Sequence, residues 1–327
     1  MSGVVSRTVT LDEADLRLDR WFKRHYPGLS HIQLQKLLRS GQVRLDGKRV
    51  KANARLAPDQ LIRVPPLGEM PERKETSTRV VDKDQDVLRD RILHMDDDVI
   101  VLDKPPGLAV QGGTGITRSV DGMLDTLKFD KSDRPRLVHR LDKDTSGVLV
   151  LARSPGVAAK LTRSFRSRDT HKVYWAVVVG VPDLPAGKID MALSKLPGKQ
   201  GERMVPDQAN GKKATTLFRV IEKTSRQAAW VQLEPVTGRT HQLRVHMAET
   251  GTPIHGDGKY GGAEAFIPGQ GLSRKLHLHA RAIRIPHPGK GGMLDVFAPL
   301  PDHMRATWDF LGFDENSDDD PFSEDME

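Results

Sequence analysis

One stretch of the sequence, RLVHRLDKDTSGVLVLA at residues 136–152, limits most strongly what this chain can fold into. Its second half, residues 148–152, is an uninterrupted apolar run, which predicts a buried strand. Its first half gathers five ionisable residues within six positions: His139, Arg140, Asp142, Lys143 and Asp144. Charged groups at the entrance of a buried strand cost free energy unless they are paired or belong to a site. We therefore expect a loop, held by the strand, whose charges have partners or a function.

Length and composition exclude several classes of protein. The chain has 327 residues, more than one domain usually holds, so we expect two domains. No apolar run approaches the ~20 residues of a membrane span, and the first residues do not resemble a signal or transit peptide. We expect a cytoplasmic protein. Because the chain has no cysteine, disulfides, thiolate metal sites and cysteine nucleophiles are excluded.

The charge is distributed unevenly along the chain. The formal net charge is +7, but the tail at 314–327 holds eight acidic residues and no basic one. Residues 1–313 therefore carry a charge of +15, which indicates a polyanionic partner. Nucleic acid is the first candidate, an anionic membrane surface the second, and a merely solubilising surface the alternative. We expect the acidic tail to be disordered.

After an N-terminal arm at 1–13, residues 14–66 predict a small unit of two helices followed by short strands. Leu18, Trp21 and Phe22 recur at helical spacing. Ser30 is suited to begin a second helix and Gly41 to end it. We expect this helix to bury its aliphatic residues: Ile32, Leu34, Leu37 and Leu38. An Asp46-Gly47 pair between short alternating segments predicts a hairpin.

The small unit is also strongly basic, with twelve Lys or Arg against three acids between Arg17 and Arg63. A charged face that only has to be solvated normally mixes both signs, so this one favours phosphate binding. With LRSGQVRLDGKRVK at its centre, the unit resembles the S4 RNA-binding domain. We expect its RNA-binding residues to be Arg20, Lys23, Lys36, Arg39, Arg44, Lys48 and Arg49.

Residues 67–90 are rich in proline and polar residues and predict a linker. A larger domain follows at 91–313. We expect strands at 99–102, 148–152, 173–179, 216–221, 229–236 and 281–285, and helices at 155–166 and 240–250. We expect a basic, loop-like segment at 185–213, which is a further candidate RNA contact. Strands joined by short turns outnumber helices, so we expect an α+β fold with mixed α/β content and a largely antiparallel sheet.

Two interpretations of the loop at 139–144 follow from its residues alone. Arg140 and Asp142 can form ordinary ion pairs at the strand entrance. Alternatively, DKDT at 142–145 matches the D-x-D-x-T of aspartyl-phosphate phosphatases, in which the first Asp attacks phosphorus. That chemistry needs an apolar strand leading into the first Asp, whereas here the strand follows it. It also needs a magnesium ion held by later acids, and no convincing pair is found.

A third interpretation uses the whole string. HRLDKDTSG at 139–147 resembles the H-R-L-D-x-x-T-S/T-G signature of the RluA-type pseudouridine synthases. KVYWAVVVG at 172–180, PVTGRTHQLRVHM at 235–247 and GTPIHGDGKYGG at 251–262 are similar to further motifs of that family, in the same order. An S4-like unit before them is typical of the branch that modifies large-subunit rRNA. The resemblance thus extends along nearly the whole chain.

The resemblance implies an isomerase that needs no cofactor and no metal. The glycosidic C–N bond of a flipped uridine breaks, the uracil turns, and a C–C bond forms. Asp142 aligns with the catalytic carboxylate, which acts as nucleophile or as base. Arg244 aligns with its basic partner, which favours the ionised carboxylate. The resemblance also assigns base flipping to Arg140, stacking on the uracil to Tyr174 and an apolar wall to Leu243; the last two side chains also suit a plain core.

Other polar residues have weaker signals. His139 and His241 are expected to be structural or orienting. His277 and His279 alternate as a metal pair would, but no third ligand has suitable spacing. Lys104 precedes a Pro-Pro-Gly loop and is suited either to a phosphate contact or to a structural role. The expected partner is large-subunit rRNA, free or in an assembling subunit, with no membrane involved and the protein a monomer. A non-catalytic rRNA-binding protein is the alternative.

Overall fold

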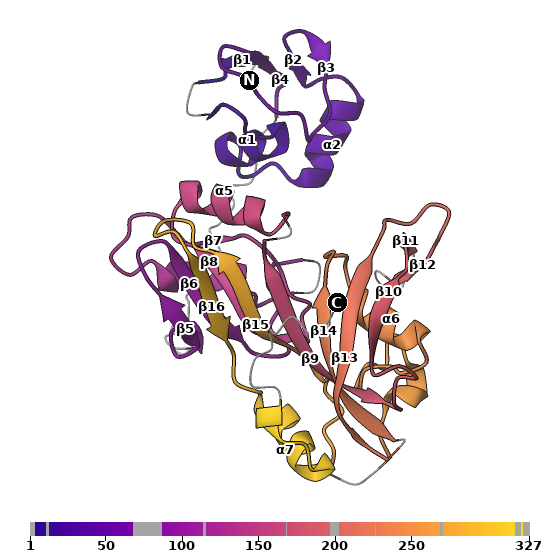
Figure 1. Cartoon of the computed structure of the whole chain (residues 1–327). Helices are drawn as coiled ribbons and strands as arrows, with labels where there is room; N and C mark the ends of the chain where they lie inside the picture. Colours follow the sequence, from indigo (N-terminus) through magenta and orange to yellow (C-terminus); the bar gives the residue numbers. More distant parts are fainter. Residues whose placement is uncertain are drawn as a thin grey trace. The chain divides into compact units, whose positions relative to one another are not determined.

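The computed structural model describes residues 4–10, 13–67, 87–113, 116–167, 169–196, 203–225, 227–268, 271–317 and 322. The chain divides into two compact units, Met1–Val81 and Asp82–Glu327. The first is drawn in indigo to violet and the second in purple through magenta and orange to yellow (Figure 1). Most of the expected linker and most of the acidic tail lie outside the described residues.

The first unit consists of two helices and a four-stranded sheet. The helices are α1 (Leu18–His25) and α2 (His31–Arg39). The sheet has the order β1-β4-β2-β3, with β1 Val5–Thr8, β2 Arg44–Leu45, β3 Lys48–Arg49 and β4 Leu61–Val64. Leu18, Trp21 and Phe22 are buried in its core, as their spacing predicts. The residues expected to form an arm instead supply β1, which pairs antiparallel with β4.

Local sequence signals explain the turns of this unit. The Ser30 hydroxyl accepts a hydrogen bond from the Gln33 backbone N–H, and the Gln33 side chain accepts one from the Ser30 N–H, so α2 begins with a capping box. Asp46 and Gly47 have φ of 49° and 74° between β2 and β3, as the predicted hairpin requires. The expectation that Ile32 is buried is wrong. Its side chain is 79% exposed, because it lies on the outer side of α2 from Leu34 and Leu38.

The second unit is built on a ten-stranded sheet. Its order is β10-β13-β14-β9-β15-β8-β6-β5, with β16 also paired to β15 and β7 to β8. Among the described strands, β8 and β15 pair in parallel and the other neighbours are antiparallel. The bounds are β5 Ile92–Met95, β6 Val99–Lys104, β7 Arg136–Leu137, β8 Ser146–Ala152, β9 His171–Val179, β10 Ala186–Asp190, β13 Thr215–Thr224, β14 Ala228–Pro235, β15 Leu278–Pro286 and β16 Met293–Phe297. The α+β fold with a largely antiparallel sheet is therefore confirmed.

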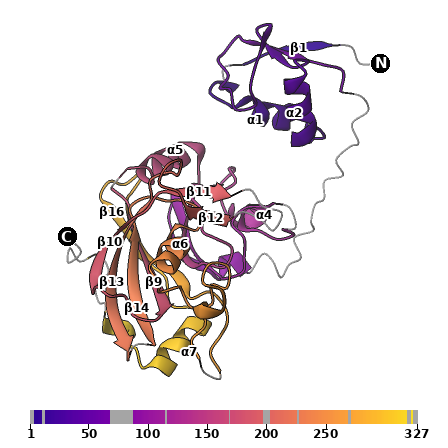
Figure 2. The same ribbon diagram turned by 90° about the vertical axis from the view of Figure 1, so that its right-hand side faces the viewer.

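Helices cover both faces of this sheet, and the alternation of side chains along each strand decides what each face meets. On β9, Ala176 and Val178 pack with α6 (Gln242–Glu249), whereas Trp175 and Val177 pack with α7 (Asp302–Leu311). On β8, Leu149 and Leu151 pack with α4 (Val120–Met123) and η2 (Leu124–Leu127), and Val148 and Val150 pack with α5 (Pro155–Ser164). Figure 2 shows α6 over the strands β9 and β14.

Two features of the second unit differ from expectation. The segment expected to be loop-like, 185–213, contains β10 and the hairpin of β11 (Leu193–Leu196) and β12 (Arg203–Pro206). The helix α7 and the short helices η3 (Gly262–Ala265) and η4 (Glu315–Ser317) were not expected. Within the described residues, no helix has the length and apolar character needed to cross a membrane.

Candidate active site

The loop that carries Asp142 is held in place by the start of β8. Gly147 has φ of +101°, and a Cβ there would lie 2.2 Å from the Ala280 carbonyl oxygen on β15. Only glycine permits the two parallel strands to approach so closely. The Ser146 hydroxyl meets Nδ1 of the buried His279 at 2.8 Å. The last residues of the TSG string thus anchor the loop to the middle of the sheet.

A buried lysine braces the same loop. Lys104 is 1% exposed, and its Nζ donates to the carbonyl oxygens of Pro105, Leu108 and Lys143 over 2.8–3.0 Å. Burial lowers the pKa of Lys104 to about 7, although the carboxylates of Asp144 and Asp142 oppose the shift. All three protons of an ammonium group are engaged by these carbonyls. These contacts agree with the structural role considered for Lys104.

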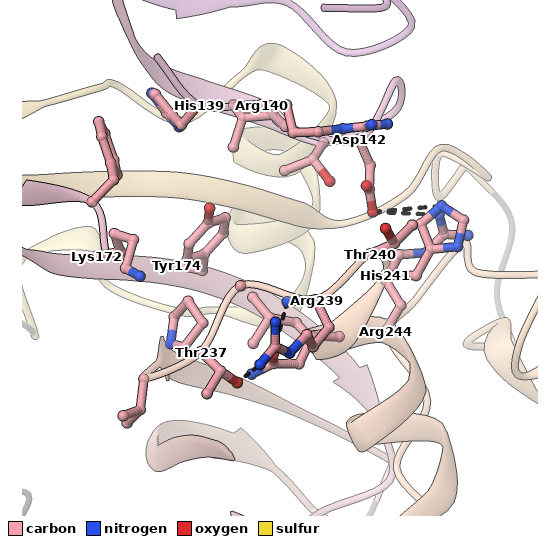
Figure 3. A pocket seen from close by; sticks show the side chains of 18 of the residues that line it. His139, Arg140, Asp142, Lys172, Tyr174, Thr237, Arg239, Thr240, His241 and Arg244 are labelled. Carbon is pink, nitrogen blue, oxygen red and sulfur yellow. Dashed lines mark hydrogen bonds and ion pairs between the residues drawn. The ribbon is translucent and has the colours of Figure 1, made fainter. Parts of the chain in front are cut away.

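The five predicted site residues come together around one cavity of about 530 Å³: Arg140, Asp142, Tyr174, Leu243 and Arg244 all line it. In Figure 3, Asp142, His241 and Arg244 lie at one end, and Tyr174 and Lys172 lie toward the other. Arg140 is exposed at the surface of the cavity. Residues more than a hundred positions apart in the sequence thus form a single pocket.

Arg244 joins two carboxylates. Its Nε and Nη2 donate to the two carboxylate oxygens of Asp257, each over 2.7 Å, and its Nη1 lies 3.8 Å from Oδ2 of Asp142. Burial alone would lower the pKa of Arg244, but the hydrogen bonds and charge of Asp257, with the charge of Asp142, raise it. Arg244 is therefore a fixed cation whose free edge faces Asp142.

The turn before α6 sets the direction of Arg244. Gln242 is 3% exposed; its amide donates to the Thr215 carbonyl and its oxygen accepts from the Thr237 hydroxyl and the Arg239 N–H. His241 takes the left-handed conformation, with φ of 53°. These contacts start the helix so that Leu243 and Arg244, in its first turn, point into the cavity.

His241 and Tyr260 complete the surroundings of Asp142. The Nε2 of His241 lies 3.8 Å from Oδ2 of Asp142, and its Nδ1 lies 2.6 Å from the Tyr260 hydroxyl oxygen. Burial lowers the pKa of His241, against the charge of Asp142. The Arg244 guanidinium also lies over the Tyr260 ring, 5.1 Å from its centroid. The carboxylate of Asp142 thus faces two nitrogen groups that are themselves held.

Tyr174 reaches the cavity because of its place on β9. Val173 and Trp175 belong to the α7 side, so Tyr174 falls on the α6 side, where it packs against the core and lines the cavity. Burial, and then the charge of Asp142, raise the pKa of Tyr174. Its ring is therefore a neutral aromatic surface. A purely core tyrosine, the alternative for this residue, would not line the pocket.

Comparison with known proteins gives this geometry a family. The family model described as RNA pseudouridylate synthase matches residues 98–249, which include Asp142, Tyr174 and Arg244. Ribosomal large subunit pseudouridine synthase C of Escherichia coli (strain K12) is 36% identical over 301 residues, which are 91% of this chain and 93% of that protein. The protein of the same name from Yersinia pestis is 37% identical over 91% of this chain. The chain belongs to the RNA pseudouridylate synthase family.

A solved structure agrees with this assignment. The human RNA pseudouridylate synthase domain containing 4 is 31% identical, with a TM-score of 0.58, and the match covers 70% of this chain and 95% of that one. The chain is accordingly an enzyme, a pseudouridine synthase that isomerises uridine in RNA.

The candidate site of this pseudouridine synthase includes groups that the sequence analysis did not predict. Asp257 lies in the string GTPIHGDGKYGG, which carried the resemblance, but no residue was chosen there. An acid beside glycines has the appearance of an ordinary turn residue. Tyr260, in the same string, and Lys172, two positions before Tyr174, were likewise passed over. Lys172 lines the cavity, and burial lowers its pKa.

The histidines of the enzyme have structural surroundings, as expected. The Nε2 of His139 accepts the Val150 N–H at 2.8 Å, and burial, followed by the charge of Lys172, lowers the pKa of His139 to about 3. His277 and His279 are fully buried, and each ring has protein partners at both nitrogens. Within the described part of the chain, one trio has metal-ligand spacing: Asp96, Asp98 and His287. It contains neither carboxylate of the D-x-D pair.

The second acid of that pair is placed unlike a phosphatase residue. Asp144 is exposed, and it does not line the cavity that holds Tyr174 and Leu243. Of the two acids, Asp142 alone reaches the cavity that contains Tyr174 and Leu243. The family assignment replaces the phosphatase alternative.

The basic residues selected in the first unit are all exposed: Arg20, Lys23, Lys36, Arg39, Arg44, Lys48 and Arg49. The Arg44 guanidinium donates to the Gly41 and Gly47 carbonyls, which holds it beside the hairpin turn. Arg39 makes a weaker contact of this kind, because its Nε donates to the Gln35 carbonyl oxygen over 3.4 Å.

Proposed function

We propose that this enzyme converts specific uridines of large-subunit (23S) rRNA to pseudouridine. Two relatives named ribosomal large subunit pseudouridine synthase C match it over 91% of its length, and they support this substrate. The observation that carries the proposal is the position of Asp142, a carboxylate 3.8 Å from the fixed guanidinium of Arg244 in a cavity that also contains an aromatic ring and an apolar wall.

The proposed chemistry begins at the ribose of the flipped uridine. Asp142 attacks the sugar or removes a proton from it, and the bond between C1′ and N1 of uracil breaks. The Arg244 guanidinium favours the ionised carboxylate before the step and offsets the negative charge of the departing uracil during it. The uracil then turns and C5 bonds to C1′, while the bond between Asp142 and C1′ breaks or the proton taken from the sugar returns to it. The C5 proton is lost and N1 gains one, so that Asp142 is regenerated and product and substrate are isomers.

The other cavity residues hold the base while it turns. The ring of Tyr174 is proposed to stack on the uracil, which is worth ~1–3 kcal/mol per base and offsets part of the cost of flipping. Leu243 provides an apolar wall that does not compete for the hydrogen-bonding edge of the base. Arg140, exposed at the cavity, is proposed to enter the space that the uracil leaves in the RNA.

The first unit is proposed to act as an S4-like RNA-binding domain at 14–66. Its two helices, its hairpin and its seven exposed basic residues support this role. We expect the enzyme to act as a monomer, because one chain supplies all five predicted site residues of the cavity. We expect it to act in the cytoplasm. Removing residues 1–66 should weaken the affinity for rRNA and reduce the salt dependence of that affinity. The second unit should still convert uridine to pseudouridine.

Tritium release from 5-tritiated uridine in large-subunit rRNA, measured in EDTA, tests the proposed function. The full chain should release tritium without any added cofactor, and the pseudouridines formed should map to a small number of positions. A protein that binds the rRNA tightly but releases no tritium would instead be a binding protein, and the proposal would be wrong.

A further inference from the structure

A second cavity, of about 570 Å³, borders the one that contains Tyr174. Asp142, His241 and Arg244 line both cavities, so the two meet at the proposed catalytic carboxylate. The rest of the second lining comes from three separate loops, 106–107, 143–144 and 256–259, and from residues 274–276 before β15. Its basic residues Lys143, Lys259, Arg274 and Lys275 were not among the residues predicted for the site.

The second cavity is lined by more basic than acidic side chains, and we refer to it as the basic cavity. Four exposed basic side chains line it: Lys143, Lys259, Arg274 and Lys275. Asp144 is the exposed acid among its lining residues. Asp257, which also lines it, is buried and already paired with Arg244. An excess of positive charge on a concave wall attracts an anion.

The walls of the basic cavity are fixed by the fold. The Arg274 guanidinium lies over the Phe266 ring, 3.9 Å from its centroid. At Gly256, where φ is +83°, a Cβ would lie 2.0 Å from the Lys275 carbonyl oxygen, so the two loops touch through their backbones. The carbonyl of Lys143 accepts from Lys104 Nζ and from the Gly107 N–H. The cations therefore project from a rigid frame, which lowers the entropy cost of binding.

We propose that the basic cavity binds the RNA backbone next to the flipped uridine, through the phosphate that links this nucleotide to its neighbour. The inference deepens the proposed function and rests on it. The C1′ atom that reacts must lie at Asp142, and both phosphates of the nucleotide are attached to the same ribose. A carboxylate repels a nearby phosphate. The cations of the basic cavity offset this repulsion and set the ribose against Asp142.

Two variants test the proposal, each lacking two exposed positive charges. Arg274→Ala with Lys275→Ala removes charge from the basic cavity. Lys160→Ala with Lys223→Ala is the matched control on α5 and β13, because both lysines are exposed, line neither cavity and lie outside the segment 185–213. Single-turnover tritium release from rRNA, with enzyme in excess, gives a half-saturating enzyme concentration and a limiting rate for each variant.

The cavity variant should raise the half-saturating concentration about 10-fold or more, with a limiting rate within about 2-fold of the unaltered enzyme, whereas the control should change neither by more than about 2-fold. Losing the neutralisation of this one phosphate of single-stranded RNA should also reduce the slope of log affinity against log salt by about 0.7. If the cavity variant matches the control in half-saturation and slope, or if it loses only its limiting rate, the proposal is overturned.

A binding measurement separates this inference from the proposed function. Fluorescence polarisation of a labelled oligouridylate requires no turnover. It measures affinity directly, so it also yields the slope of log affinity against log salt. If the unaltered enzyme releases no tritium, the proposed function fails, yet a smaller slope for the cavity variant than for the control still supports the basic cavity. An active enzyme whose cavity variant binds the oligouridylate with the control's slope retains its function and contradicts the inference.

Discussion

At the scale of single residues, the site depends on an acid that does not face the substrate. Asp257 is 2% exposed and takes two of the three nitrogens of Arg244, which leaves Nη1 directed at Asp142. Replacing Asp257 with Asn keeps the shape of the side chain but removes the charge and one acceptor. Arg244 would then be free to turn toward Asp142 or away from it.

We expect Asp257→Asn to reduce the limiting rate about 10²-fold, because a displacement of about 1 Å at a catalytic group costs that much. The half-saturating enzyme concentration should change by less than about 3-fold, since Asp257 does not touch the RNA in the proposed arrangement. The matched control is Asp295→Asn, which breaks the surface pair with Arg284, 2.8 Å long and worth little. A limiting rate within 2-fold of the unaltered enzyme would show that Asp257 does not position Arg244.

The residues of the cavity differ in how far the sequence predicted them. Asp142, Tyr174 and Arg244 stand in strings whose order resembles a family, and the structure places all three at one cavity. Asp257 stands in such a string as well, but its partner is thirteen positions earlier on a different element. Only the fold brings the two side chains together, so no local pattern could assign Asp257 a role.

At the scale of elements, alternation and capping signals predicted most of the structure. The strands β8, β9 and β14 are rich in buried apolar residues, and α2 has a complete capping box. The prediction of a loop at 185–213 was wrong, because the Gly, Pro and Lys residues of this segment are not typical of strands. Its three short strands form only by pairing with β13 or with each other. Edge strands of this kind owe their order to partners far away in the sequence.

Two glycine substitutions test whether the contact between β8 and β15 holds the catalytic loop. Gly147→Ala places a Cβ 2.2 Å from a backbone oxygen at a positive φ, and we expect it to reduce the free energy of unfolding by more than about 3 kcal/mol. Gly156→Ala, in the first turn of α5, meets nothing within 4 Å and should be neutral or slightly stabilising. Denaturant unfolding measures both, and equal stabilities for the two variants would contradict the account.

At the scale of the whole molecule, buried neutral histidines make stability depend on pH. The Nε2–H of His279 donates to the Ala298 carbonyl, so Nδ1 accepts from Ser146, and burial lowers the pKa of His279 to about 3. The unfolded chain protonates this residue near pH 6.5. The unfolded state therefore binds more protons between these pH values, and the free energy of unfolding falls as the pH falls below about 6.5.

We expect His279→Gln to flatten this dependence by up to about 1.4 kcal/mol per pH unit between pH 6.5 and 5, the contribution of one proton. The window lies above the range in which Glu13 and Asp96, whose pKa values are lowered, lose their stabilising charge. His171→Gln, at the exposed start of β9, is the control for the substitution itself. The same slope in all three proteins would mean that His279 is not held neutral.

The central claim, that Asp142 alone of the two acids in the D-x-D string does the chemistry, is tested most directly by tritium release from rRNA. Asp142→Asn should reduce turnover at least about 10⁴-fold, since the carboxylate proposed to attack or deprotonate the sugar is gone, while rRNA affinity stays within about 3-fold. Asp144→Asn, at an exposed position two residues away, should keep turnover within about 3-fold. Near-normal activity of Asp142→Asn, or a comparable loss in Asp144→Asn, would contradict the assignment of Asp142.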